Sequence, residues 1–245
     1  MSSQQEIAQR LEQLRQRIAA AARRVHRDPE EVTLLAVSKK KPARAVAEAF
    51  ASGQVDFGES YVQEAAAKIS EVQELLSASS QAAPGELATP RWHFVGHLQR
   101  NKAKAIAWEL DCFHALDRES LARELEKHAA QAGRSLEVLI QVNLSGETQK
   151  GGVAPEETRS LLEAIAPFPH LQPVGLMTLP PATKDPEQNR PYFAQLREMR
   201  DQLRDVEGFE KIRELSMGMS QDFEVAVEEG ASIVRLGTAV FGPRD

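Results

Sequence analysis

The sequence predicts an α/β protein: a single closed barrel of eight parallel strands, a (β/α)8 or TIM barrel, with one extra helix at the N-terminus. Three observations support this prediction: strand-like and helix-like segments alternate regularly, the first strand is apolar throughout, and the chain has 245 residues. Eight strand–helix repeats in about this length favour a closed barrel over an open doubly wound sheet. We therefore expect one domain over residues 1–245.

An amphipathic helix is predicted at the start of the chain, over residues 4–25. Its apolar residues recur at steps of three, four and seven and form one stripe: Ile7, Leu11, Leu14, Ile18 and Val25. The next segment, VTLLAVS at 32–38, is a short run rich in β-branched residues, which is typical of a strand buried on both faces. No terminal helix is expected after the eighth strand, so the N-terminal helix is expected to cover that part of the barrel.

The alternation continues to the C-terminus. Two helices, over 60–77 and 189–206, are well supported by apolar residues spaced three and four apart. Further helices are expected near residues 43–52, 99–108, 118–132, 155–166 and 220–230. Further strands are expected near residues 55–57, 92–95, 111–115, 136–142, 173–178, 213–216 and 232–236. Small and turn-forming residues predict a mobile surface loop over 77–90 and a second loop over 180–189.

Composition and charge exclude several classes of protein. The chain is 42% apolar and 27% charged, as in ordinary globular proteins, and its net charge of −6 gives no electrostatic reason to bind nucleic acid or anionic lipid. Its apolar runs are too short for a membrane span, and the polar N-terminus lacks a signal-peptide core. A single cysteine, Cys112, allows neither an internal disulfide nor a thiolate metal cluster. We expect a cytoplasmic protein, with a monomer as the default state.

Polar side chains collect where the predicted strands end. In a barrel of this kind the functional site lies at the C-terminal ends of the strands, so the residues at these exits are the candidates for function. They are Ser38-Lys39, Gly58 to Ser60, His97, His114 to Asp117, Asn143, Met177-Thr178, Ser216 to Ser220, and Arg235 to Thr238.

Lys39 directly follows the first predicted strand. A partly desolvated lysine at the mouth of a barrel loses stability in its charged form, so its amine becomes available for Schiff-base chemistry with a carbonyl compound. The alternative is that Lys39, Lys40 and Lys41 form a solvated basic turn, and spacing alone favours that alternative. Lys39 is the candidate because it lies nearest to the strand.

The exits of the last two strands favour a phosphate site. SMGMSQDF leads from strand seven into a helix whose expected N-cap is Ser220, and the free N–H groups and dipole of a helix start attract anions. RLGTAVFG follows strand eight, and Gly237 and Thr238 can bring backbone N–H groups close to an anion. Barrels frequently bind phosphate between these two loops. The alternative is that these glycines only make turns.

Asn143 and Arg235 end buried runs and are candidates for polar roles in the site. An arginine beside a pyridine nitrogen would keep that nitrogen unprotonated, because a guanidinium hardly gives up its proton. Met177 and Met219 are most simply core residues, but as strand-exit residues they are also included among the expected cofactor neighbours.

His93 and His97 are four residues apart, a spacing that would suggest metal binding on a helix. On the strand predicted at 92–95 this spacing does not place them side by side, and no carboxylate trio lies nearby, so we expect no metal site. His93 is expected to be packed or hydrogen-bonded near the site.

A lysine that captures carbonyl groups and a phosphate cradle together point to pyridoxal 5'-phosphate (PLP). The segments LLAVSKKKP, FGESYVQEA, WHFVGHLQRNK, GLMTLPP, LSMGMSQDF and VRLGTAVFG resemble, in order, the signature segments of the YggS-like pyridoxal phosphate homeostasis proteins. The resemblance runs from about residue 31 to the C-terminus. Its most specific parts are HFVGHLQRNK and LSMGMS with the VRLGTA that follows.

This resemblance implies a fold like the N-terminal barrel of bacterial alanine racemase and a covalent aldimine between PLP and Lys39. It implies phosphate contacts from Ser220, Gly237 and Thr238, and an Arg235 that faces the pyridine nitrogen. The family is described as binding PLP without an established reaction and as balancing vitamin B6 and amino-acid pools, with apo PLP enzymes as candidate partners.

At one position the chain departs from the family pattern. Ser60 stands in FGES where the family often has Asn, which leaves a side-chain contact to the cofactor open at this position. The loop over 77–90 is also longer than usual, but it lies outside every signature segment.

A non-catalytic PLP carrier or regulator is the favoured function, and a PLP-dependent amino-acid racemase is the alternative. Racemisation needs bases on both faces of the α-carbon, and in alanine racemase one base comes from a second, β-rich domain. This chain ends at Asp245, directly after the predicted barrel, so that domain is not expected. A single barrel also leaves the cofactor open to water, which favours exchange over chemistry. A nucleic-acid-binding module is rejected, because only the basic triplet at 39–41 supports it.

Overall fold

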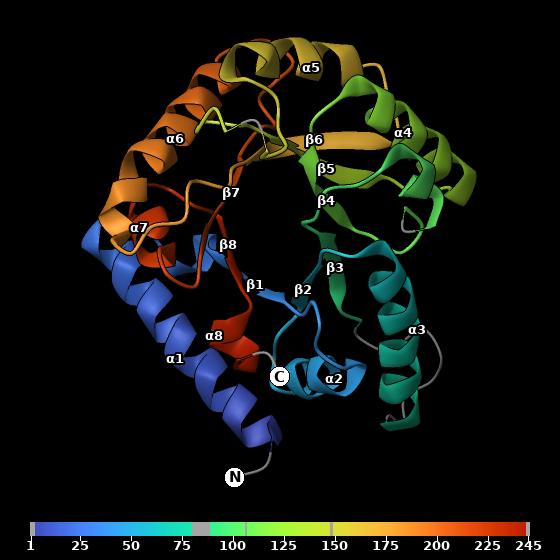
Figure 1. Ribbon diagram of the computed structural model, residues 1–245, viewed down its shortest axis with the longest axis vertical. Coiled ribbons are helices and arrows are strands. Elements are labelled where there is room, and N and C mark those ends of the chain that lie inside the picture. The colour runs from blue at the N-terminus through green and yellow to red at the C-terminus, as the bar shows by residue number, and fades with distance from the viewer. Residues whose placement is uncertain (1–2, 80–88, 106, 148, 244–245) are drawn as a thin grey trace.

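In the computed structural model, eight parallel strands close into a barrel that is surrounded by helices (Figure 1). The structure describes residues 3–79, 89–105, 107–147 and 149–243. The strands follow one another around the barrel in sequence order, and β8 returns to β1 through pairs such as Leu35 with Arg235. The closed barrel confirms the predicted fold class.

All eight predicted strands are present, with ends that differ by a few residues from those expected. They are β1 Thr33–Val37, β2 Asp56–Glu59, β3 Arg91–Phe94, β4 Cys112–Leu116, β5 Leu136–Gln141, β6 Leu171–Met177, β7 Glu214–Met219 and β8 Ile233–Leu236. The predicted exits after β4 and β7 do reach Asp117 and Ser220, which directly follow these strands, but their first residues, His114 and Ser216, lie inside β4 and β7. Both side chains are fully buried, so a polar residue in these strands marks a position inside the fold and not the end of the strand.

The α-helices outside the barrel are α1 Ser3–Arg24, α2 Ala43–Ala51, α3 Val62–Ser79, α4 Glu119–Ala132, α5 Thr158–Ile165, α6 Arg190–Arg204, α7 Phe223–Glu228 and α8 Thr238–Phe241. The helix α8 corrects the expectation that no helix follows the last strand. The helix predicted near 99–108 is a 3-10 helix, η2 Arg100–Ala105, in a polar segment without an apolar stripe. The predicted loop over 77–90 is partly wrong, because residues 77–79 belong to α3, while 80–88 lie outside the described residues.

The N-terminal helix α1 lies along the outside of the molecule against α2, α7 and α8, as predicted (Figure 1). Its apolar stripe is buried at Ile7, Leu11, Leu14 and Ile18. Val25 does not belong to this stripe, because α1 ends at Arg24 and the Val25 side chain is 38% exposed. The burial of the stripe holds α1 in the position that closes the ring of helices.

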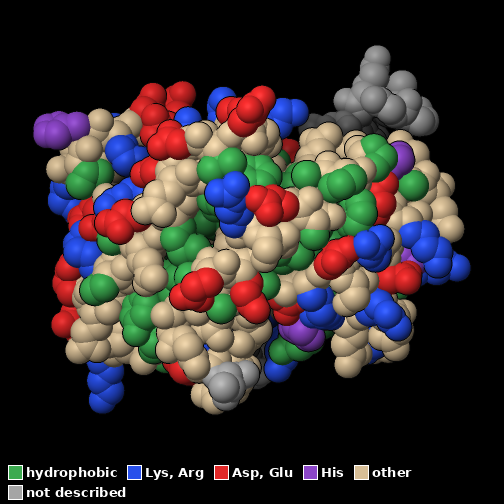
Figure 2. Space-filling view, turned by 90° about the horizontal axis from the view of Figure 1, so that it is seen from above, with side chains coloured by type: hydrophobic (Ala, Val, Ile, Leu, Met, Phe, Trp, Pro, Cys, Tyr) green, Lys and Arg blue, Asp and Glu red, His purple; other side chains and the backbone are tan. Residues whose placement is uncertain are grey.

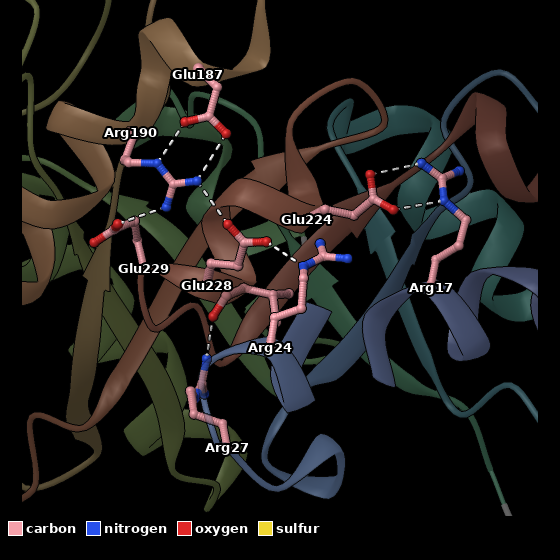
Figure 3. A network of polar contacts seen from close by, with 9 residues as sticks. Arg17, Arg24, Arg27, Glu187, Arg190, Glu224, Glu228 and Glu229 are labelled. Carbon is pink, nitrogen blue, oxygen red and sulfur yellow. Dashed lines mark hydrogen bonds and ion pairs between the residues drawn. The ribbon is translucent and has the colours of Figure 1, made fainter. Parts of the chain in front are cut away.

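Ion pairs fasten α1 to α7 at the edge of this contact (Figure 3). Arg17 binds Glu224 with two hydrogen bonds, at 3.1 and 3.2 Å, and Arg24 Nε donates to Glu228 at 2.7 Å. Arg190 at the start of α6 also binds Glu228, at 2.7 Å. Single exposed pairs contribute little to stability, but a connected network fixes the relative position of the three helices.

The surface carries charges of both signs. On the face seen in Figure 2, acidic and basic side chains are interspersed, and neither sign forms a continuous field over this face. Across the described residues, no helix combines the length and the apolar character needed to span a lipid bilayer.

Truncation of the stripe should destabilise the fold. Leu11→Ala should lower the free energy of unfolding by about 2–5 kcal/mol, because it opens a cavity at a fully buried position. Val25→Ala is the matched control and should change the free energy by no more than about 0.5 kcal/mol, because Val25 is exposed. Urea unfolding followed by circular dichroism measures both values. Equal effects would contradict the packing of α1.

Candidate functional site

A cavity of about 350 Å³ opens at the C-terminal ends of the strands. Its walls come from the ends of β1, β2, β3, β7 and β8 with the turns that follow them, and from the segment after β6. Seven of the residues predicted for the site line it: Lys39, Ser60, Met219, Ser220, Arg235, Gly237 and Thr238. The structure thus brings together residues from both ends of the chain.

Two other predicted site residues do not line this cavity. Asn143 organises its own loop: its amide nitrogen donates to the carbonyl oxygens of Glu147 and Lys150 at 2.9 and 3.2 Å, and its amide oxygen accepts from the Gly146 N–H at 3.1 Å. Met177 is fully buried at the end of β6. Their predicted contact with a cofactor stays a prediction.

The three consecutive lysines after β1 have different surroundings. Lys39 is half-buried and lines the cavity, whereas Lys40 is exposed. Lys40 has a left-handed φ of +61°, and its backbone N–H donates to the carboxylate of Glu64. Lys41 donates to the carbonyl oxygen of Pro243. The turn is therefore not a uniformly solvated basic segment, and Lys39 is the lysine that faces the cavity.

A buried ion pair that the sequence analysis missed lies against this turn. Lys68 on α3 donates to the Glu59 carboxylate at 2.5 Å and to the Ser38 carbonyl oxygen at 2.7 Å. The Ser38 hydroxyl donates to the same Glu59 oxygen at 2.7 Å, and all three residues are buried. Burial raises the pKa of Glu59, although Lys68 and Ser38 oppose this shift. These contacts anchor the residue next to Lys39.

The turn between β7 and α7 is held by Asp222. One oxygen of its carboxylate accepts from the Met219 N–H at 2.7 Å, and the other accepts from the amide of Asn189 at 2.7 Å. The helix α7 begins at Phe223, with Asp222 at the cap position, so the predicted N-cap role of Ser220 is wrong. Ser220 lies in the turn itself and lines the cavity.

Two glycines of the signature segments are required by close contacts. Gly218 has a φ of +88°, and a Cβ there would lie 2.5 Å from the Cβ of Ala226 on α7. A Cβ at Gly96 would lie 2.3 Å from the carbonyl oxygen of Ser60. These glycines allow the turn after β7 and the close approach of the β3 and β2 exits.

Arg235 is buried in β8 and is one of the residues that line the cavity. It donates to the Ser216 hydroxyl at 2.7 Å and to the Thr178 carbonyl oxygen at 2.9 Å. Burial lowers the pKa of Arg235 to about 10, and the nearby Asp222 partly offsets this shift. Arg235 therefore remains a cation at neutral pH.

His93 and His97 differ in their surroundings, as the strand predicted at 92–95 implies. His93 is buried and hydrogen-bonded, which confirms its expected role, whereas the His97 side chain is 61% exposed and lies 3.8 Å from Asp117. Among the described residues, His93, Cys112 and His114 place potential metal ligands within 4.8 Å of one another. The facing ring nitrogens of the two histidines, however, lie 2.9 Å apart in a hydrogen bond, so these nitrogens already have a partner.

Comparisons with known proteins agree with this architecture. The family model described as "Alanine racemase, N-terminal domain" matches residues 9–245. A pyridoxal phosphate homeostasis protein of Aquifex aeolicus is 41% identical over 236 residues, which cover 96% of this chain and 97% of the relative. Its counterpart of Escherichia coli K12 is 42% identical over 244 residues, which cover 98% and 97%.

A solved structure shows the same fold. PipY of Synechococcus elongatus, determined with PLP bound, is 36% identical to this chain and superimposes with a TM-score of 0.80. The match covers 96% of this chain and all of PipY, 100%. The barrel is therefore of the alanine racemase N-terminal type that the sequence predicts.

Replacement of Glu59 should change how stability depends on pH. Because its folded pKa is raised above 4.5, the folded state holds this proton more tightly than the unfolded state. The stabilisation from Glu59 is therefore complete below pH 4.5 and is lost as the pH rises through the folded pKa. The free energy of unfolding of the wild type should fall relative to that of Glu59→Gln over this range.

Urea unfolding at a series of pH values measures this difference. Glu12→Gln, on the exposed face of α1, is the control, and its difference from the wild type should vary much less over the same range. A free energy of unfolding of the wild type that rises with pH relative to that of Glu59→Gln would contradict the raised pKa of Glu59.

Proposed function

The chain belongs to the family of the alanine racemase N-terminal domain, and we propose that it binds PLP at the mouth of the barrel as a non-catalytic protein of vitamin B6 homeostasis. One observation carries this proposal. Lys39, near the start of the chain, shares a cavity with Ser220, Arg235, Gly237 and Thr238, near its end. The relatives named as pyridoxal phosphate homeostasis proteins and the PLP-bound PipY support it.

The cavity fits PLP in size and in the chemistry of its walls. A volume of about 350 Å³ lies in the range of small-molecule sites. PLP supplies an aldehyde, a phosphate dianion and a pyridine ring. The Lys39 amine would condense with the aldehyde, forming a carbon–nitrogen double bond and releasing one water molecule. The hydroxyls of Ser220 and Thr238 and the backbone at Gly237 would hold the phosphate.

The residues around the cavity support binding without turnover. Racemisation would need a second proton-transfer group opposite Lys39. Among the described residues that line the cavity, Lys39, Asp222 and Arg235 are the ionisable ones. Asp222 is engaged by Asn189 and by the backbone of Met219, and Arg235 remains protonated at neutral pH. Neither is suited to the role of a second base.

A binding site of this kind fits a protein that stores PLP or passes it on. In this role the protein would keep the aldehyde of PLP from reacting with other amines, while a cavity open to water allows exchange. Apo PLP enzymes as recipients, the cytoplasmic location and the monomeric state stay predictions.

Purified protein loaded with PLP should be yellow, and Lys39→Ala should lose the visible absorbance, because the condensed amine is absent. Lys40→Ala is the matched control and should keep the colour, since Lys40 is exposed and lies outside the cavity wall. Borohydride reduction followed by peptide mapping identifies the labelled lysine. Label at Lys40, or a yellow Lys39→Ala protein, would refute the assignment.

Alanine racemisation by the PLP-loaded protein should stay near the background rate of free PLP, because a second base is lacking at the cavity. Circular dichroism or chiral chromatography of the alanine product measures the rate. Robust turnover that disappears in Lys39→Ala would support the racemase alternative instead.

A further inference from the structure

A chain of hydrogen bonds crosses the inside of the barrel below the cavity. Arg235 donates to the Ser216 hydroxyl at 2.7 Å, and that hydroxyl lies 2.8 Å from Nδ1 of His114. The Nε2 atom of His114 lies 2.9 Å from Nδ1 of His93, whose Nε2 lies 3.0 Å from the Asp56 carboxylate. These five residues come from five different strands, so the hydrogen-bond chain links five of the eight strands of the barrel.

This hydrogen-bond chain connects the two ends of the barrel. Arg235 lines the cavity at the C-terminal ends of the strands, whereas Asp56 is the first residue of β2. The contact between His114 on β4 and Ser216 on β7 joins strands that are not neighbours, so it spans the interior. His93, His114 and Ser216 are each no more than 1% exposed. The network is therefore sealed from solvent between its two ends.

When both imidazoles are neutral, the two end groups set the direction of every hydrogen bond between Arg235 and Asp56. An arginine can only donate hydrogen bonds, and a carboxylate can only accept them. Asp56 therefore accepts from Nε2–H of His93, and a neutral His93 then accepts at Nδ1 from Nε2–H of His114. Neutral His114 in turn accepts at Nδ1 from the Ser216 O–H. The Ser216 oxygen is left with its lone pairs available to the Arg235 guanidinium.

Burial supports the neutral state of His114. Desolvation lowers the pKa of His114 well below its ordinary value, and the neighbouring His93 and Arg235 lower it further. The guanidinium of Arg91 lies 3.7 Å from the same carboxylate oxygen of Asp56. A second proton, on Nδ1 of His93, would make that nitrogen a donor to Nε2 of His114, and His114 would then carry its own proton on Nδ1. The tautomer of His114 therefore reports the direction of the hydrogen-bond chain.

We propose that Asp56, His93, His114 and Ser216 are positioning residues that hold Arg235 in place by a hydrogen-bond chain of fixed direction. Because Arg235 lines the cavity, they would orient bound PLP through it, and this second step rests on the proposed function. The structure supports the proposal because a Ser216 hydroxyl that donates to His114 cannot turn its hydrogen toward the guanidinium. Loss of His114 would free the hydroxyl to rotate and would weaken the hold on Arg235.

Nitrogen-15 NMR of the PLP-free protein near neutral pH tests the direction of the chain without any cofactor. Both His93 and His114 should show the neutral tautomer with the proton on Nε2. Asp56→Leu removes the terminal acceptor, and the Nδ1–H form of His93 should then appear. A His114 ring that carries its proton on Nδ1 in the wild type, or an imidazolium at His93, would overturn the proposal.

A double-mutant cycle tests whether His114 acts through Ser216. The measured quantity is the rate of PLP release into a trap, followed by the loss of visible absorbance. Ser216→Ala and His114→Phe should each speed release about tenfold, the effect of losing one good hydrogen bond to a charged group. The double variant should also release about tenfold faster, because His114 has nothing to act on once the hydroxyl is gone.

His128→Phe is the matched control, because His128 is also buried but lies on α4 and contacts Gln131. Its release rate should equal that of the wild type. The positioning role would be overturned if the increases in release rate multiplied in the double variant. It would also be overturned if His114→Phe released PLP at the wild-type rate. A wild type that takes up no PLP would overturn the proposed function, while the tautomer spectra would still decide on the chain itself.

Discussion

The site depends on one constraint: a charged arginine is kept inside the barrel. Arg235 is 5% exposed, and its contacts with Ser216 and with the Thr178 carbonyl oxygen are with neutral groups. A buried cation is costly unless its donors are satisfied, so the strands around it must supply polar atoms. This requirement explains why Ser216 and His114 lie buried on facing strands of the barrel.

The walls of the cavity are fixed from outside the barrel. On one side, the buried Lys68–Glu59 pair holds the residue that precedes Lys39. On the other side, Asp222 binds the turn after β7, and the helix that follows this turn is fastened by Arg17 of α1. The N-terminal helix therefore does more than cover apolar surface, since it supports α7, the helix that directly follows the turn containing Ser220. The first and last parts of the chain are thus coupled at the site.

The fold was predictable because the pattern of apolar residues alone specifies alternating strands and helices, and most of the cavity wall follows once strand exits are known. The errors that concern buried polar residues have a common physical cause. Ser216 and His114 are polar residues inside strands, and sequence patterns cannot show that they satisfy one another. The Lys68–Glu59 pair was missed for the same reason, because its partners are joined only by the packing of α3 on β2. Val25 lies beyond the end of its helix and so faces solvent.

The family resemblance implies that Arg235 faces the pyridine nitrogen, and such a position bears on why PLP binding need not lead to turnover. The electron-accepting power of a pyridine ring is greatest when its nitrogen is protonated, and an arginine is a poor source of that proton. Here the guanidinium is held by two acceptors and stays charged at neutral pH, with a pKa of about 10. A residue fixed in this way can orient a ring without activating it. Firm orientation with weak activation is what a protein that carries PLP requires.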